Sequence, residues 1–244
     1  MFTPFAFIID PSFYNPTPIA PASQYLLIGG GFTQYNSIVV NRIAQLDSTG
    51  SLDSSFNMGI GFQSGILYFL TQQPDGKYLT GGFNISSYNN FTATRIVRIN
   101  RNGTYDSSFN FGAGPNNNPI KAIPLSDNSN IIVGQFTTYS GSLVNGIVKT
   151  TPSGAIDTTF NIGFGFNSNP IYSIDRQSDG KFIVVGNFTQ YSASNNYITR
   201  TNLSGSRTAG PGSGFNTGVG FNNQVTTMVT QSDGKILVVG GMTT

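Results

Sequence analysis

The four-residue pattern G-x-F-[TN] recurs along the chain at a nearly constant interval. It occurs at residues 30–33, 81–84, 134–137 and 186–189, and a fifth copy at 240–243 reads G-G-M-T. The aromatic position therefore steps by 51 to 54 residues along Phe32, Phe83, Phe136 and Phe188, with Met242 in the last copy. Self-similarity at a fixed period is typical of repeat architectures, in which each unit needs its neighbours to bury its apolar face.

Two further markers keep the same period. One is a turn, P-D-G-K or S-D-G-K, at 74–77, 178–181 and 232–235, with a degenerate copy at 126–128. The other is D-[ST]-[ST]-F-N at 53–57, 106–110 and 157–161, with a degraded copy at 214–216 and a similar segment at 10–13. The carboxylates in these markers recur, so we expect them to stabilise turns: Asp75, Asp127, Asp179 and Asp233 in the first, and Asp10, Asp53, Asp106 and Asp157 in the second.

The fourth repeat can be divided into strands from its turn and polarity pattern. Strands are predicted at 170–177 and 181–189 around the Asp179-Gly180 turn, because Asp-Gly is a strong hairpin signal. A polar loop at 190–196 leads to a third strand at 197–203, and a fourth, weaker strand ends near Phe215. The third strand has equivalents at 41–46, 94–99 and 145–150.

Four antiparallel strands in about 50 residues is the size of one propeller blade. We therefore predict an all-β protein, a β-propeller of about five four-stranded blades. The repeated Phe side chains are expected to fill the space between blades, and the Gly two positions earlier to allow close approach or a bulge.

Composition agrees with this class and narrows the chemistry. The chain has 10 acidic residues, all Asp, no His, Cys or Trp, and only 9% charged residues. A His-based triad, a thiol nucleophile and a zinc site are thereby excluded, and we expect no cofactor, metal or catalytic residue. The net charge of +2 is too small to indicate a nucleic-acid partner. The densest basic cluster, Arg95, Arg98 and Arg101, is expected on a solvated strand.

The motif string resembles the delta-60 repeats, a β-propeller family. The resemblance is carried by residues 52–62, 73–84 and 95–103, and it extends over nearly the whole chain from about Tyr25. Residues 14–24 depart from the pattern. Such repeats occur in bacterial surface proteins and phage proteins, which is what the resemblance implies here, and it carries no active site across.

A single domain over 1–244 is predicted. The chain stops after the second strand of its fifth copy and begins with a segment that reads as the end of a repeat. A composite blade from both termini would close the ring, with residues 11–22 as its seam, and leave no sheet edge exposed. An open arc completed by another chain is the alternative.

Two acidic residues, Asp47 and Asp175, fall outside the repeat scheme, which is a weak basis for a glycosidase that needs two neighbouring carboxyl groups. The first residues lack a basic, then apolar, signal-peptide pattern, and no apolar run has the length of a membrane helix. We expect neither a signal peptide nor membrane insertion.

These observations favour a non-enzymatic structural or interaction module with protein partners in a larger assembly. It would be a virion component (phage tail, fibre or capsid decoration) or a surface adhesion protein, located in the virion or at the cell surface. A carbohydrate-binding propeller is the alternative, and a glycan-active hydrolase or lyase is a more remote one. Cell-surface glycan would be bound by loops that recur at one position of the repeat: Tyr35, Asn36, Tyr88, Asn89, Tyr139 and Tyr191.

Overall fold

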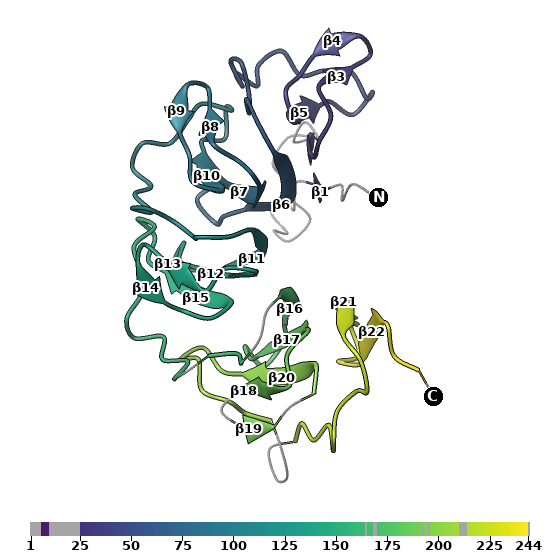
Figure 1. The fold of residues 1–244 in the computed structure, drawn as a ribbon. Helices are drawn as coiled ribbons and strands as arrows, with labels where there is room; N and C mark the ends of the chain where they lie inside the picture. The colour runs from purple at the N-terminus through teal and green to yellow at the C-terminus, as the bar shows by residue number, and fades with distance from the viewer. Residues whose placement is uncertain are drawn as a thin grey trace. The chain divides into compact units, whose positions relative to one another are not determined.

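A computed structural model describes residues 6–9, 25–163, 165–167, 170–191, 193–194, 196–209 and 214–243. Within these residues the regular structure consists of strands, which form four copies of one unit and the first two strands of another (Figure 1). Repeat 1 holds β1 (Ala6–Ile9), β2 (Leu26–Gly29), β3 (Gln34–Tyr35), β4 (Ile38–Val39) and β5 (Ile43–Leu46). Repeat 2 holds β6 (Ile66–Gln72), β7 (Tyr78–Phe83), β8 (Ser87–Tyr88), β9 (Phe91–Thr92) and β10 (Ile96–Ile99).

The next two repeats follow the same plan, and the last is shorter. Repeat 3 holds β11 (Pro119–Pro124), β12 (Asn130–Gly134), β13 (Thr138–Tyr139), β14 (Ser142–Leu143) and β15 (Ile147–Thr150). Repeat 4 holds β16 (Ile171–Arg176), β17 (Phe182–Gly186), β18 (Gln190–Tyr191), β19 (Ala193–Ser194) and β20 (Ile198–Thr201). Repeat 5 holds β21 (Val225–Thr230) and β22 (Ile236–Gly240).

Each complete repeat forms an antiparallel sheet in which the second strand is central. The order is β1-β2-β5, β6-β7-β10, β11-β12-β15 and β16-β17-β20, whereas β21 pairs with β22 alone. The central strands β12 and β17 are buried at every residue, which explains their continuous apolar sequence. The first three strands predicted for repeat 4 are thus found, and so are the predicted equivalents of its third strand in repeats 1 to 3.

Two features of the repeat differ from the prediction. The polar segment 190–196, predicted as a loop, contains the short hairpin β18–β19, and β3–β4, β8–β9 and β13–β14 are its equivalents. The predicted fourth strand is reduced to one bridge per repeat, such as Ile99 with Tyr105 and Thr150 with Ile156. It ends there because the next residue, Asp106 or Asp157, turns the chain with its own side chain.

A bulge lies on the first strand. One residue of this strand is left unpaired in repeats 2 to 5, between Leu67 and Phe69 in the first of them. The repeated glycine of the central strand lies opposite, and an added Cβ at Gly134 would be 2.3 Å from the carbonyl oxygen of Asn118. The glycine therefore admits the first-strand backbone, which is the close approach that its repetition suggests.

The repeated aromatic position is occupied differently in repeat 2. Phe136 and Phe188 are fully buried, but Phe83 is 40% exposed. In repeat 3 the amide of Gly146, the residue before the third strand, donates to the carbonyl of Phe136. In repeat 2 the amide of Arg95, at the same position, donates to the carbonyl of Ile85. Ile85, which is buried, therefore takes the place predicted for Phe83. The cause is one extra residue between Gly82 and Ile85, where Asn84 has a positive φ of 50°.

Apolar residues of neighbouring sheets form the core. In one cluster Ile131 and Val133 of repeat 3 pack with Ile171 and Val184 of repeat 4. In another, Ile183 and Val185 on the opposite side of the repeat 4 sheet pack with repeat 5. A sheet in this arrangement is covered on both faces, so its stability depends on the adjacent repeats.

The chain divides into two compact units, 1–109 and 110–244. The prediction of one domain over 1–244 stays a prediction. In the first unit β1 pairs with β2, as the first strand does in repeats 2 to 4, whereas the sequence predicted this segment to be the end of a repeat. Closure of the ring by a composite blade stays a prediction. The segment 10–13 and the seam 11–22 lie outside the described residues.

Because Ile85, and not Phe83, is the buried residue of repeat 2, the two side chains should contribute differently to stability. Ile85→Ala removes a buried side chain and should lower the free energy of unfolding by about 2–4 kcal/mol, as buried Ile-to-Ala changes do. Phe83→Ala, at an exposed position, should cost less than about 1 kcal/mol. Urea unfolding followed by circular dichroism measures both. Equal losses for the two variants would contradict the assignment.

Candidate functional site

The Asp of the D-[ST]-[ST]-F-N marker turns the chain after the third strand. In repeat 2, Asp106 Oδ1 accepts hydrogen bonds from the backbone amide and the hydroxyl of Ser108, at 3.0 and 2.7 Å. Asp53 makes the same pair of bonds with Ser55, and Asp157 with Thr159. In each of these three repeats one carboxylate oxygen thus accepts hydrogen bonds within the turn, and the other points elsewhere.

The second oxygen meets a cation in repeats 2 and 3. Asp106 Oδ2 accepts from Arg98 Nε at 2.6 Å and from Lys77 Nζ at 3.0 Å. Asp157 Oδ2 accepts from Lys149 Nζ at 2.7 Å. Arg98 is buried, with its guanidinium 4.6 Å from the centre of the Phe109 ring, so the prediction that it lies on a solvated strand is wrong. The ion pair and the ring stabilise the charge inside the fold.

These contacts set the acidity of the two carboxyl groups. Burial would raise the pKa of Asp106, but the hydrogen bonds from Ser108, Lys77 and Arg98 together outweigh it and lower the pKa to about 2. The hydrogen bond from Lys149, followed by that from Thr159, lowers the pKa of Asp157 to about 2. Both groups are therefore held as carboxylates.

The Asp of the other marker shapes the hairpin between the first two strands. In Asp75, Asp179 and Asp233 the Oδ1 atom accepts from the backbone amide two residues later, at 3.0 to 3.1 Å. Asp127 makes the same bond to Ser129, and the hydroxyl of Ser129 adds a second. Asn128, which replaces Gly here, has a positive φ of 64°. The degenerate copy thus keeps the turn geometry.

The repeated tyrosines, expected to contact a ligand, are turned into the fold. Tyr88, Tyr139 and Tyr191 are fully buried. Their hydroxyl groups donate to the backbone carbonyls of Gly103, Gly154 and Gly205, and Tyr35 donates to that of Gly50. Burial also raises the pKa of these three buried phenols. Each tyrosine therefore fastens its hairpin to the turn after the third strand. The rings of Tyr88, Tyr139 and Tyr191 lie inside the fold, whereas Tyr35 is half-buried.

The two asparagines of the same loops lie at hairpin turns. Asn36 and Asn89 have positive φ angles of 48° and 51°, a conformation that Asn adopts readily. Asn36 is exposed, whereas the side chain of Asn89 accepts from the backbone amide of Ile60 at 3.2 Å. Both asparagines therefore suit the backbone conformation of their turns.

The two acidic residues outside the repeat markers have local partners as well. Asp47 Oδ1 accepts from Thr49 and Ser51, and the hydroxyl of Thr49 is the main cause that lowers its pKa. Asp175 Oδ2 accepts from the backbone amide of Thr230 at 2.8 Å and so links β16 to β21. They belong to different units. Among the described residues no group of three acidic side chains could hold a metal ion.

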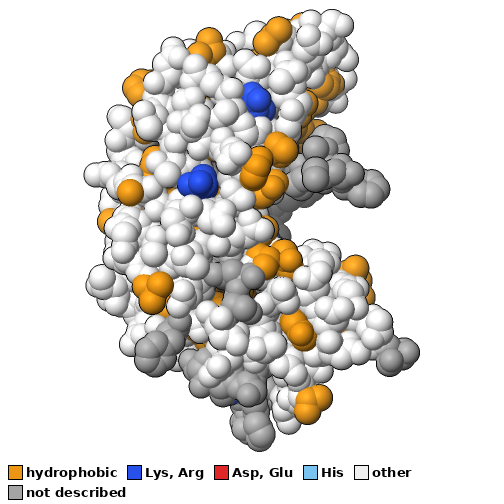
Figure 2. Space-filling model, in the orientation of Figure 1, with side chains coloured by type: hydrophobic (Ala, Val, Ile, Leu, Met, Phe, Trp, Pro, Cys, Tyr) orange, Lys and Arg blue, Asp and Glu red, His pale blue; other side chains and the backbone are white. Residues whose placement is uncertain are grey.

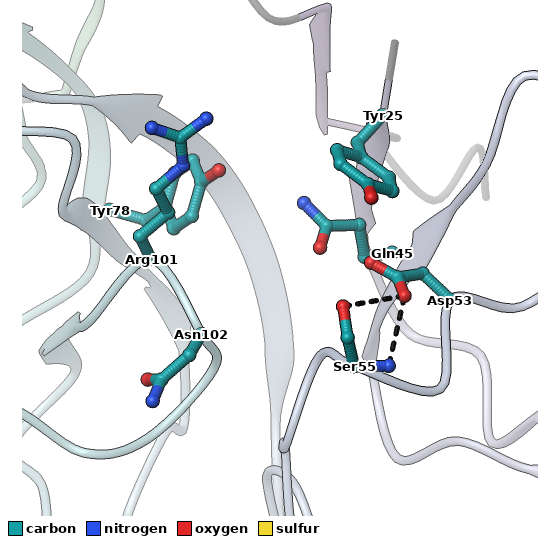
Figure 3. A pocket seen from close by; sticks show the side chains of 7 residues that line it. All are labelled: Tyr25, Gln45, Asp53, Ser55, Tyr78, Arg101 and Asn102. Carbon is teal, nitrogen blue, oxygen red and sulfur yellow. Dashed lines mark hydrogen bonds between the residues drawn. The ribbon is translucent and has the colours of Figure 1, made fainter. Parts of the chain in front are cut away.

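A cavity of about 340 Å³ lies within the first unit, between the sheets of repeats 1 and 2. Figure 3 shows its lining side chains: Tyr25, Gln45, Asp53, Ser55, Tyr78, Arg101 and Asn102. The side chains of Asp53 and Ser55 lie on the repeat 1 wall, and Arg101 and Asn102 lie on the opposite wall (Figure 3). Asp53 Oδ2 is buried without a hydrogen-bond partner. An alignment of the repeats could have found this site in the sequence, because Gln45 stands where repeats 2 and 3 have Arg98 and Lys149.

One face of the molecule carries little charge. On the face shown in Figure 2, most described atoms belong neither to charged nor to hydrophobic side chains, and the apolar side chains are scattered. The described residues contain no helix long and apolar enough to cross a membrane.

Sheets repeated with one strand order and one set of turn bonds define a tandem-repeat β protein. Four stretches, 26–56, 73–109, 125–160 and 177–207, match the family model "Domain of unknown function (DUF5122) beta-propeller". The chain belongs to this family, which is that of the delta-60 repeats, and the resemblance found in the sequence is confirmed. A search of curated proteins gives no significant match.

The paired carboxylates predict an acid-sensitive stability. The pKa values of Asp106 and Asp157 are lowered from 3.8 to about 2 on folding, so their contribution is complete above pH 4 and is lost as the pH falls towards 2. The double variant Asp106→Asn, Asp157→Asn should lose stability at pH 7 and show a weaker decline below pH 4. Unfolding free energies between pH 2 and 7 test this. A decline of the unfolding free energy below pH 4 that is as steep in the double variant as in the wild type would contradict this prediction.

Proposed function

We propose that the chain is a non-enzymatic interaction module that joins a larger protein assembly. The observation that carries the proposal is an uncovered apolar surface on repeat 5, here called the terminal face and formed by Val229, Leu237 and Val239. These side chains are 51%, 58% and 55% exposed. They share one face, because Val229 is directly opposite Leu237 in the β21–β22 register and Leu237 and Val239 are two residues apart.

The repeats themselves indicate what covers such a face. Leu237 and Val239 occupy the positions that Ile183 and Val185 hold in repeat 4, where both are fully buried. Repeat 5 covers Ile183 and Val185 with Val225 and Met228. An apolar sheet of a partner protein would bury the terminal face in the same way, and that burial would drive association.

The polar residues of the repeat support a role without catalysis. The carboxylates of both repeat markers bond to turns, and three of the tyrosines are buried. Such residues serve the scaffold, and a scaffold repeated several times suits structural roles. We therefore favour a virion component, such as a tail, fibre or capsid-decorating protein, or a surface adhesion protein. Binding of glycan through the rings of Tyr88, Tyr139 and Tyr191 is not favoured, because those rings are buried.

Charged substitutions on the terminal face test the proposal. Leu237→Asp with Val239→Asp should abolish association with the partner assembly, because a carboxylate in an apolar interface is costly to desolvate. Val219→Asp, at an apolar residue that is 86% exposed in a loop, is the matched control and should have no effect. Incorporation into purified particles or surface fractions, measured by quantitative mass spectrometry, reports the result.

Two outcomes would contradict this function. One is a chain found only as a free monomer, absent from every particle and surface fraction. The other is a double variant that assembles as the wild type does. A double variant that lowers the melting temperature of an isolated monomer but leaves assembly unchanged would assign the terminal face to packing within the chain.

A further inference from the structure

The cavity beside Asp53 occupies a position where other repeats hold cations. In repeat 2 the carboxylate of Asp106 meets Arg98, which pairs with Leu79 in the β10–β7 register, and Lys77, which directly precedes β7. In repeat 1 the residue at the Arg98 position is Gln45, which pairs with Leu27 in the β5–β2 register. The residue at the Lys77 position, directly preceding β2, is Tyr25.

The backbone confirms that these positions correspond. The amide of Asp53 donates to the carbonyl of Gln45 at 2.8 Å, as the amide of Asp106 donates to that of Arg98 at 3.1 Å. Repeat 1 thus keeps the acid and its turn but has lost both basic residues. The carboxylate has therefore lost the two cations that neutralise its equivalent in repeat 2.

Asp53 therefore has one carboxylate oxygen without a hydrogen-bond donor. Its Oδ1 atom is used by Ser55, while Oδ2 is buried without a hydrogen bond. A buried charged oxygen without a donor is costly, so a donor that enters the cavity gains more there than at the surface. In repeats 2 and 3 the group that bonds this oxygen is an ammonium or a guanidinium.

The rest of the lining suits the same group. The cavity is also lined by the aromatic residues Tyr25 and Tyr78 and by Gln45 and Asn102, whose side-chain carbonyl groups are hydrogen-bond acceptors for an N–H donor. Arg101 stands on the wall opposite Asp53 (Figure 3), so the cation would be attracted towards the Asp53 wall.

We propose that this cavity binds a lysine or arginine side chain presented by a protein partner, with its cationic head on Asp53 Oδ2. The incoming side chain would restore the contact that Lys77 and Arg98 make within repeat 2. The partner class rests on the proposed interaction function, but the cation site does not. Its test therefore uses the isolated chain and is independent of the assembly experiment.

Titration with blocked amino acids tests the site directly. N-acetyl-lysine amide and N-acetyl-arginine amide should shift the backbone NMR signals of Ser55 and Asn102 in a saturable way. N-acetyl-norleucine amide, which lacks the charge, and glucose should not. Asp53→Asn keeps an oxygen for the Ser55 turn and should weaken binding at least about tenfold, the effect of losing a charge-assisted hydrogen bond. Asp47→Asn removes the same charge from an exposed turn of the same unit and should bind as the wild type does.

Rebuilding the lost pair gives a second readout. Gln45→Arg should fill the cavity with an internal cation, abolish binding of both probes and raise the melting temperature by a few degrees, as a buried ion pair of good geometry can. Arg101→Gln should strengthen binding by removing a like charge. Equal binding of the norleucine or glucose probe, or unchanged binding by Asp53→Asn, would overturn the proposal. So would a Gln45→Arg variant that folds yet still binds the lysine probe.

Discussion

A sheet of three short strands cannot be stable when both of its faces are apolar, and this constraint governs the whole chain. The central strands β12 and β17 are buried on both sides, which only neighbouring sheets can achieve. The requirement explains why one period runs through the sequence, since a face that packs well against one copy packs well against the next. The last described sheet, β21–β22, has exposed apolar side chains at Val229, Leu237 and Val239.

Within that common frame the repeats differ in the residue that faces the marker Asp. The pairing of the marker Asp with a basic residue of the third strand is present in repeats 2 and 3. Repeat 4 holds Arg200 at this strand position, with the backbone carbonyl of Thr208 as its partner, and repeat 1 keeps the acid, Asp53, beside Gln45. Repeats with the same backbone can therefore place different residues beside the marker Asp, because the turn uses only one of its two carboxylate oxygens.

Much of this architecture could be predicted from the sequence. The period, the antiparallel strands and the Asp-Gly hairpins follow from local signals, such as the β-branched run at 181–189 and the Asp179-Gly180 turn. The extra residue of repeat 2 was hidden, because Gly81-Gly82 allows the motif to be aligned in two ways and only the pairing of Gly82 with Leu67 decides between them. The hairpin β18–β19 was hidden because strands of two residues have no periodicity to detect.

Roles that depend on distant partners were beyond sequence reasoning. The burial of Arg98 depends on Asp106 and Phe109, and the cavity depends on two sheets facing each other. The tyrosines resembled ligand contacts because they recur in loops, and their function became visible only with the carbonyls that they bond. A recurring aromatic residue near a loop indicates a packing role as readily as a binding one.

The bond between each buried tyrosine and its glycine carbonyl has a consequence for how such a chain can evolve. It joins residues 14 or 15 positions apart within one repeat, so the hairpin and the turn are fastened without help from the adjacent copies. A duplicated or deleted stretch of one period carries both ends of this bond with it. Copy number can thus change by whole units through unequal recombination, and the length of the protein becomes a heritable variable that leaves the local geometry of every surviving unit intact.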